Sequence, residues 1–211
     1  EDQAGGFWVG SIHQGSGIAG VKSSDVTIQH AHVQETHQAG IKFFKSQDIT
    51  IEESVIEDTR GPGLSFVKTE NVTLKNVELR DVGTYQGETS LAGPPVDVTL
   101  FAEADPNAVP STDWSLKNAG VALRQTQHTS IQNLTIRGAG SYGVWADGAL
   151  DTTLESVDMA GVEHGIWFRN SQDVFITDAN IELPGTHTKW VKGWPEVGLF
   201  DFQTGASVAA S

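Results

Sequence analysis

Two stretches far apart in the chain read almost as copies: "GIKFFKSQDITIEESVIED" covers residues 40–58, and "GIWFRNSQDVFITDANIEL" covers residues 165–183. Each begins with a glycine and an apolar residue and carries SQD at the same place. Alignment on that glycine gives six copies, which begin at Gly17, Gly40, Gly63, Gly120, Gly143 and Gly165. The spacing is 22 or 23 residues, except for one gap of 57 that equals a repeat of 23 plus 34 further residues. A fixed period of this length indicates a solenoid.

Three apolar columns run through the aligned copies. The first column is Ile18, Ile41, Leu64, Val121, Val144 and Ile166. The second is Ile28, Ile51, Leu74, Ile131, Leu154 and Ile176, and the third is Val33, Ile56, Leu79, Ile136, Met159 and Ile181. Stretches around them, such as DITIEE at 48–53, alternate with the period of two that is typical of strands. A polar column holds Asp25, Asp48, Asn71, His128, Asp151 and Asp173, and Asx side chains of this kind fit stacked tight turns.

These columns favour a coil with three strands per turn, in which each strand pairs in parallel with the strands one turn above and below. A leucine-rich repeat has a similar period, but it requires L-x-x-L-x-L-x-x-N and usually a helical return segment, and the copies contain neither. Over residues 17–183 the copies resemble the repeats of right-handed parallel β-helix proteins, the pectate-lyase-like superfamily. The resemblance implies an all-β, single-stranded, right-handed parallel β-helix of about six coils with one long loop insertion.

We expect residues 1–211 to form a single domain. Residues 1–16 would be a partial coil or cap, residues 17–183 the coils, residues 84–117 the loop insertion and residues 184–211 a C-terminal cap. The tail has apolar side chains suited to covering the last coil: Trp190, Trp194, Phe200 and Phe202. Members of the superfamily are usually longer, which points to a larger polypeptide or an oligomer as the natural setting.

The composition bears on the partners. The chain has 27 acidic and 13 basic residues, a formal net charge of −14 and no cysteine. Nucleic acid and anionic membrane surfaces require clustered Lys and Arg, so neither is expected as a partner. No apolar run approaches the roughly 18 residues of a membrane span. We expect an acidic protein without disulfides, secreted or displayed at the cell surface.

The strand that follows each repeat glycine has outward positions two and four residues on. In the last three copies these are Ala122 and Arg124, Trp145 and Asp147, and Trp167 and Arg169. Large aromatic side chains that face outward are uncommon without a reason, and sugar rings stack on such rings. With Tyr142 and His164 at the rim, the pattern predicts a carbohydrate groove that binds through Arg124, Tyr142, Trp145 and Trp167. The alternative is that the insertion or the tail buries both tryptophans.

Asp147, His164 and Arg169 are the candidate catalytic residues. A lyase or epimerase must neutralise a uronate carboxylate before a neighbouring proton is removed, and arginines do this. A hydrolase would instead need two opposed carboxylates, for which Asp147 could pair with Glu163, Asp97 or Glu103. A surface ion-pair ladder of Arg124, Asp147 and Arg169 is the simpler alternative. The aspartate clusters of polygalacturonases and pectate lyases have no clear counterpart, so no catalytic residue is carried over from them.

A third feature is the H-x-H pair of His30 and His32. Alternation along one strand would place both rings on the same face, with Glu53 of the next copy beside His30. Two imidazoles and a carboxylate form a reasonable transition-metal set. The sequence identifies no cofactor.

The sequence therefore predicts an extracellular, polysaccharide-binding β-helix, with lyase, epimerase or hydrolase activity left open. The alternatives are a non-enzymatic module of an adhesin, tail fibre or extracellular filament, and a metal-binding module.

Overall fold

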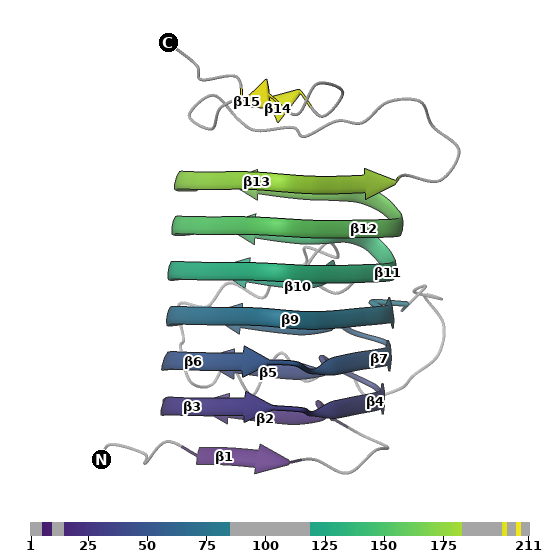
Figure 1. The fold of residues 1–211 in the computed structure, drawn as a ribbon. Coiled ribbons are helices and arrows are strands. Elements are labelled where there is room, and N and C mark those ends of the chain that lie inside the picture. The colour runs from purple at the N-terminus through teal and green to yellow at the C-terminus, as the bar shows by residue number, and fades with distance from the viewer. Residues whose placement is uncertain (1–5, 10–14, 85–118, 183–199, 202–205, 208–211) are drawn as a thin grey trace.

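The computed structural model describes residues 6–9, 15–84, 119–182, 200–201 and 206–207. Its strands stack one above another into a solenoid of six coils (Figure 1), and coils 1 to 6 are numbered here from the six repeat glycines in chain order. The predicted all-β parallel β-helix is confirmed. No helix long and apolar enough to cross a membrane occurs among the described residues.

Three walls, each formed by strands one coil apart, line the solenoid. Short strands of the first wall are β2 (Ile18–Val21), β5 (Ile41–Phe44), β8 (Leu64–Val67) and β10 (Ala119–Arg124). The second wall begins with β3 (Ser24–Gln29) and β6 (Gln47–Glu52), and the third with β4 (His32–Thr36) and β7 (Val55–Thr59). Four longer strands run on through the corners from wall to wall: β9 (Glu70–Val82), β11 (Gln127–Asp147), β12 (Leu150–Arg169) and β13 (Gln172–Glu182).

The strand register reproduces the aligned columns. The first column pairs through all six coils, from Ile18 opposite Ile41 to Val144 opposite Ile166. The second and third columns pair in the same way. Leu64 of β8 lies directly opposite Val121 of β10, so the register is the same on both sides of the gap of 57 residues between Gly63 and Gly120. The three columns form the centre of one continuous apolar core.

The two ends of the chain differ from the coils. Strand β1 (Gly6–Val9) pairs antiparallel with β2, so it covers the edge of the first wall and is not a parallel coil. Strands β14 (Phe200–Asp201) and β15 (Ala206–Ser207) form a short antiparallel pair. The predicted roles of the insertion at 84–117 and of Trp190, Trp194 and Phe202 fall outside the described residues.

The corners between walls are built from residues in the left-handed backbone region. The polar column of the alignment occupies one of these corners in every coil, with φ between 52° and 56°. Asn71 Nδ2 donates to Asp48 Oδ1 at 2.8 Å, and His128 Nδ1 lies 2.8 Å from Asp151 Oδ2 one coil away. Asx side chains tolerate this backbone at low cost, and the polar column forms side-chain hydrogen bonds from coil to coil at these two steps.

The repeat glycines mark the corner where the backbone of one coil lies closest to the next. A Cβ atom on Gly40 would lie 2.7 Å from the carbonyl oxygen of Gly63 and 2.3 Å from Cγ2 of Ile56. That same carbonyl accepts the N–H of Ile41 at 3.0 Å, so it cannot move away without loss of a ladder hydrogen bond. In every coil the third-column side chain lies within 3.2 Å of the Cβ position of the repeat glycine. Only glycine leaves room for that side chain.

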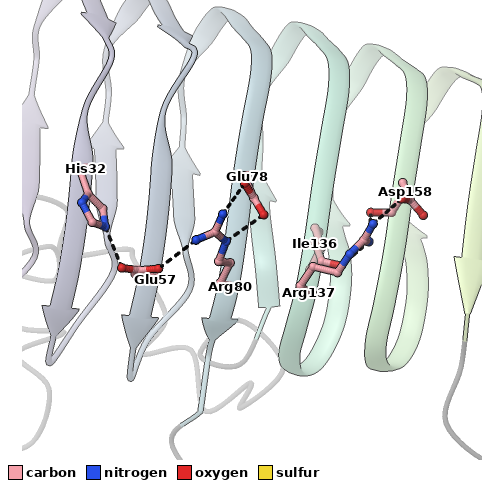
Figure 2. A network of polar contacts seen from close by, with 7 residues as sticks. All are labelled: His32, Glu57, Glu78, Arg80, Ile136, Arg137 and Asp158. Atoms are coloured by element: carbon pink, nitrogen blue, oxygen red, sulfur yellow. Dashed lines mark hydrogen bonds and ion pairs between the residues drawn. The ribbon is translucent and has the colours of Figure 1, made fainter.

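The outer face of the third wall carries a network of charged side chains from several coils (Figure 2). Glu57 of β7 is 2.7 Å from His32 Nε2 in β4 and 3.6 Å from Arg80 Nη1 in β9. Arg80 also donates from Nε and Nη2 to the two carboxylate oxygens of Glu78, each at 2.8 Å. These side chains add cross-strand contacts between coils 1, 2 and 3 to the backbone ladder.

A second group on this face joins coils 4, 5 and 6 through Asp158 of β12, and Figure 2 shows its contact with Arg137. Arg137 of β11 donates to Asp158 Oδ2, and Asn180 of β13 donates to Asp158 Oδ1 at 3.0 Å. The hydrogen bond from Arg137 is the main reason that the pKa of Asp158 is lowered, and it outweighs the opposing effect of burial. The charge of Arg137 and the Asn180 hydrogen bond act in the same direction.

Replacement of a repeat glycine should destabilise the fold. In Gly120→Ala the new Cβ would lie 2.6 Å from the Gly143 carbonyl oxygen and 2.8 Å from Ile136 Cδ1, and overpacking of this kind costs about 2–3 kcal/mol of unfolding free energy. Chemical denaturation measures the loss. The control is Gly15→Ala, because no atom of the described residues lies within 4 Å of the Gly15 Cβ position. Equal stabilities of the two variants would contradict the close-approach account.

Acidification should weaken the third-wall network. A carboxylate whose pKa is lower in the folded protein stabilises the fold above its unfolded pKa of about 3.9, and that stability is lost as the pH falls through the folded pKa. Asp158→Asn should therefore lose less stability than the wild type between pH 6 and pH 3, by roughly 0.5 kcal/mol after allowance for its exposure. Thermal denaturation across this range tests the expectation, and parallel pH profiles of the two proteins would refute it.

Candidate functional site

The outer face of the first wall in coils 4 to 6 brings the predicted site residues into two columns. Trp145 of β11 lies in register with Trp167 of β12, and Asp147 with Arg169. Arg124 of β10 continues the second column one coil below. The residues that alternate with them belong to the central core: Leu123, Ala146 and Phe168. Alternation along the strands therefore directs both columns away from the core, as predicted.

An aromatic cluster covers this face. Tyr142 is packed edge-on against Trp167, with ring centroids 6.0 Å apart and planes at 62°. Tyr142 also contacts His164, with ring centroids 4.8 Å apart and ring planes tilted by 33°. Tyr142 and Trp167 are half-buried, and His164 is exposed. The three rings thus form a partly accessible aromatic surface across coils 5 and 6.

The prediction that Trp145 is exposed is wrong. Its side chain is only 3% exposed and packs in a small apolar cluster separate from the central core, with Ala119 and Ala122. Tyr142 and Trp167 pack against the same cluster. The alanines of coil 4 are small, which leaves space for the large indole to pack within the cluster. Trp145 supports the aromatic surface, and Trp167 remains half-exposed.

Asp147 is the centre of a charged group beside the rings. Arg169 Nη2 donates to Asp147 Oδ2 at 2.6 Å, and Asn170 Nδ2 donates to Asp147 Oδ1 at 2.9 Å. The Arg169 guanidinium carbon lies 5.9 Å from the centre of the Trp145 ring, within the range of a cation–π contact. The predicted Arg–Asp ladder is therefore present between coils 5 and 6.

These contacts determine the protonation of Asp147. Burial acts to raise the pKa of this carboxyl, but the hydrogen bonds from Arg169 and Asn170 and the charges of Arg169 and Arg124 outweigh it, so the pKa is lowered. A group that transfers protons near neutral pH works best with a pKa near that pH, and Asp147 is shifted away from it. Asp147 suits an ionised acceptor better than a general acid.

Only two of the three predicted metal ligands, His30 and Glu53, come together. His30 has a left-handed φ of 53° and follows β3 at a corner, so it does not share one strand with His32, and the prediction of an alternating H-x-H strand is wrong. His30 Nδ1 lies 3.1 Å from Glu53, whereas His32 contacts Glu57. Within the described residues, no group of three or more His, Cys, Asp or Glu side chains could hold a metal ion.

The pairing of Asp147 with Glu163 as opposed carboxylates for hydrolysis stays a prediction. Within the described part of the chain the polar partners of Asp147 are Arg169 and Asn170, and Glu163 is an exposed side chain of β12. Asp97 and Glu103 lie outside the described residues. The catalytic roles predicted for Asp147, His164 and Arg169 remain predictions, and His164 is the exposed imidazole of the group.

Two features escaped the sequence analysis: Asn170 as a partner of Asp147, and the group formed by Asp158, Arg137 and Asn180 on the third wall. Both groups consist of a carboxylate that accepts from one arginine and one asparagine of neighbouring coils. The aligned repeats place these residues at outward or corner positions, and this placement was the only sequence feature that could have indicated contacts between them. Their side-chain pairing depends on rotamers that the alignment does not specify.

Comparison with known proteins gives a family and a fold. A family profile described as a right-handed β-helix region matches residues 10–91 and 119–208. No curated protein matches the chain. Among solved structures, the A-module of the mannuronan C-5 epimerase AlgE6 from Azotobacter vinelandii is similar, with 14% identity and a TM-score of 0.56 over 78% of this chain and 42% of that one.

The A-module of AlgE4 from the same organism is also similar, with 16% identity and a TM-score of 0.50 over 69% of this chain and 38% of that one. The chain therefore spans about two fifths of the length of these two structures. At such low identity the likeness concerns the fold. Since the family profile matches most of the residues and the coils stack in parallel as its description requires, the chain belongs to the family of right-handed β-helix proteins.

Proposed function

We propose that this protein binds an acidic polysaccharide outside the cell, along the first-wall face of coils 4 to 6. The observation that carries the proposal is the accessible aromatic surface of Tyr142, His164 and Trp167 beside the charged group of Arg169 and Asp147. A face that combines aromatic rings with fixed polar groups suits a ligand that has both apolar and hydrogen-bonding surfaces. Sugar rings have this character.

The charges of the site favour an acidic sugar over a neutral one. Arg124 and Arg169 contribute two positive charges, and Asp147, held ionised, offsets one of them. Arginine binds carboxylates and sulfates through charge-assisted hydrogen bonds, which are stronger than those to neutral hydroxyls. The chain has a net charge of −14, so the two arginines give this face a local positive charge that favours acidic over neutral polymers.

The structural neighbours support the same class of ligand. Both are named as modules of mannuronan C-5 epimerases, and mannuronan is an acidic polysaccharide. A β-helix offers a long, regular outer face on which a polymer can lie across several coils. An extracellular location belongs to this proposal, since such polymers are components of cell surfaces and matrices.

Binding is favoured over catalysis at this site. Asp147 is ionised and engaged at both oxygens by the protein itself, so it is poorly suited to exchange a proton with a substrate. His164 is the group that could act as an acid or a base, and it is exposed on the aromatic surface. Among the described residues of this face, His164 is the candidate acid or base for a lyase or epimerase reaction, with Arg169 stabilising the charge of the uronate.

Removal of the exposed tryptophan should abolish most of the binding. In Trp167→Ala, we expect the affinity for uronate polymers to fall about tenfold or more, which is typical when a central aromatic contact is truncated. Isothermal titration calorimetry against mannuronan, polygalacturonate, a sulfated glycan and dextran measures the change. The matched control is Phe175→Ala, which removes an aromatic side chain that is 59% exposed in β13, on the second wall and away from the site.

The same polymers, followed by size over time, separate binding from cleavage. Binding without shortening supports the proposal, and shortening that is lost in His164→Ala would identify a depolymerase at the same face. If the wild type binds none of the polymers, or if Phe175→Ala weakens binding as much as Trp167→Ala, the proposal is wrong and a scaffold role becomes the better account. The burial of Trp145 favours a scaffold role, because a buried ring is not available to a ligand.

A further inference from the structure

We infer that Asn170 is a positioning residue of this site, which acts through Asp147 to hold the Arg169 guanidinium over Trp145 in the orientation that receives an anionic ligand. The inference rests on the proposed function, and it assigns to Asn170 the preference of the site for charged over neutral sugars. Asn170 itself has its side chain directed to Asp147 of the coil below.

The contacts of Asp147 fix its carboxylate at both oxygens. Asn170 donates to Oδ1 at 2.9 Å and Arg169 donates to Oδ2 at 2.6 Å. The two donors are consecutive residues of coil 6, so a single short segment of the next coil binds both oxygens of the carboxylate. A carboxylate held at a single oxygen can rotate about its side-chain bonds, whereas a carboxylate held at both has a defined plane. The amide of Asn170 therefore restricts the side chain that orients Arg169.

The exposure of the partners shows which of them a ligand meets. The Asp147 side chain is 18% exposed and the Arg169 side chain 44%. The carboxylate is thus the inner member of the pair and the guanidinium the outer one. The guanidinium also lies 5.9 Å from the Trp145 ring, so it is held between a carboxylate and an aromatic face. A donor group that is oriented before binding loses less conformational entropy when it meets its ligand.

The backbone at position 170 is compatible with glycine. Asn170 has a left-handed φ of 51°, and the equivalent corner of coil 5 is Gly148 with φ of 70°. Asparagine and glycine tolerate this region better than other residues. Glycine at position 170 would preserve the corner and remove the amide. Asn170→Gly therefore separates the role of the side chain from that of the backbone.

The third wall provides a matched control. Asp158 also accepts from an arginine and an asparagine of neighbouring coils, Arg137 and Asn180. This group has the same chemistry as the Asp147 group but stands on another wall, away from the aromatic cluster. Asn180→Ala removes an equivalent Asn–Asp hydrogen bond of 3.0 Å. If Asn170 acts on the site, only the first-wall variant should change binding.

The test measures the dissociation constants of the wild type, Asn170→Gly and Asn180→Ala for mannuronan and polygalacturonate between pH 7 and pH 3, because the pKa of Asp147 is lowered and the group titrates in the acid part of this range. At pH 7 we expect Asn170→Gly to bind about 5- to 10-fold more weakly, because the Arg169 side chain must then be ordered when the ligand binds. Asn180→Ala should stay within about twofold. Thermal denaturation checks that both variants are folded.

The pH profile provides a readout that a purely structural role would not move. The groups that face Asp147 are Arg169 and Asn170 from β12 and the corner after it, and Arg124 from β10. The Asn170 hydrogen bond lowers the pKa of Asp147, so its removal raises that pKa. Protonation of Asp147 removes the charge-assisted hydrogen bond that orients the Arg169 guanidinium, so Asn170→Gly should lose the affinity that depends on this orientation at a higher pH than the wild type. The polymers titrate identically in both experiments, so they do not contribute to the shift.

The outcomes distinguish this inference from the proposed function. If the wild type binds neither polymer, the proposed function fails and the role of Asn170 falls with it. If the wild type binds and Asn170→Gly matches it in affinity and pH profile, Asn170 is not a positioning residue, although the binding site stands. Loss of affinity without a shift of the pH profile, or an equal loss in Asn180→Ala, would also overturn the inference.

Discussion

Each coil of this protein turns at a glycine whose Cβ position is already occupied. The third-column side chain of the same coil fills part of that space, and in coils 1 to 5 the carbonyl oxygen of the next repeat glycine limits it from the neighbouring coil. The same carbonyl oxygen also accepts a ladder hydrogen bond, as Gly63 does from Ile41. It therefore takes part both in the spacing between coils and in the limit on side-chain size at the repeat glycine. The repeat glycine is therefore a steric requirement of the stack, and it is what makes the period visible in the sequence.

Regular stacking has a consequence for the outer surface. Once the register is set, every outward position of one coil lies beside the same position of the next, so side chains interact in columns. The first wall uses this to place aromatic rings beside Arg169 and Asp147, and the third wall uses it to link His32, Glu57 and Arg80. A carboxylate that accepts from an arginine and an asparagine occurs on both the first and the third wall. Among the described residues, the first-wall group is the one that lies beside the aromatic cluster. The neighbouring side chains therefore determine whether such a group can form part of a binding site.

The proposed site combines a rigid platform with groups that are already paired. Trp145 is buried under Tyr142 and Trp167, and Asp147 is engaged at both oxygens. Neither residue has to be ordered when a ligand arrives, which lowers the entropic cost of binding. The same pairing makes Asp147 a poor proton carrier, since its pKa is moved down and away from neutrality. Preorganisation thus favours recognition of a polymer over its chemical modification at this residue.

The sequence by itself determined the solenoid, its three walls and the register of every paired column, because a period of 23 residues leaves one way to stack equivalent positions. It also identified the face on which Trp167, Asp147 and Arg169 lie, since alternation along a strand decides which side chains point outward. Only the tertiary structure decided that Trp145 is buried, because its exposure depends on the alanines of coil 4 and the rings of coils 5 and 6. The structure likewise shows that the left-handed φ of His30 places it at a corner, outside the strand that holds His32. It also shows that the rotamers of Arg169 and Asn170 allow both side chains to hydrogen-bond to Asp147. Column positions follow from the repeat, whereas side-chain conformations follow from packing between coils.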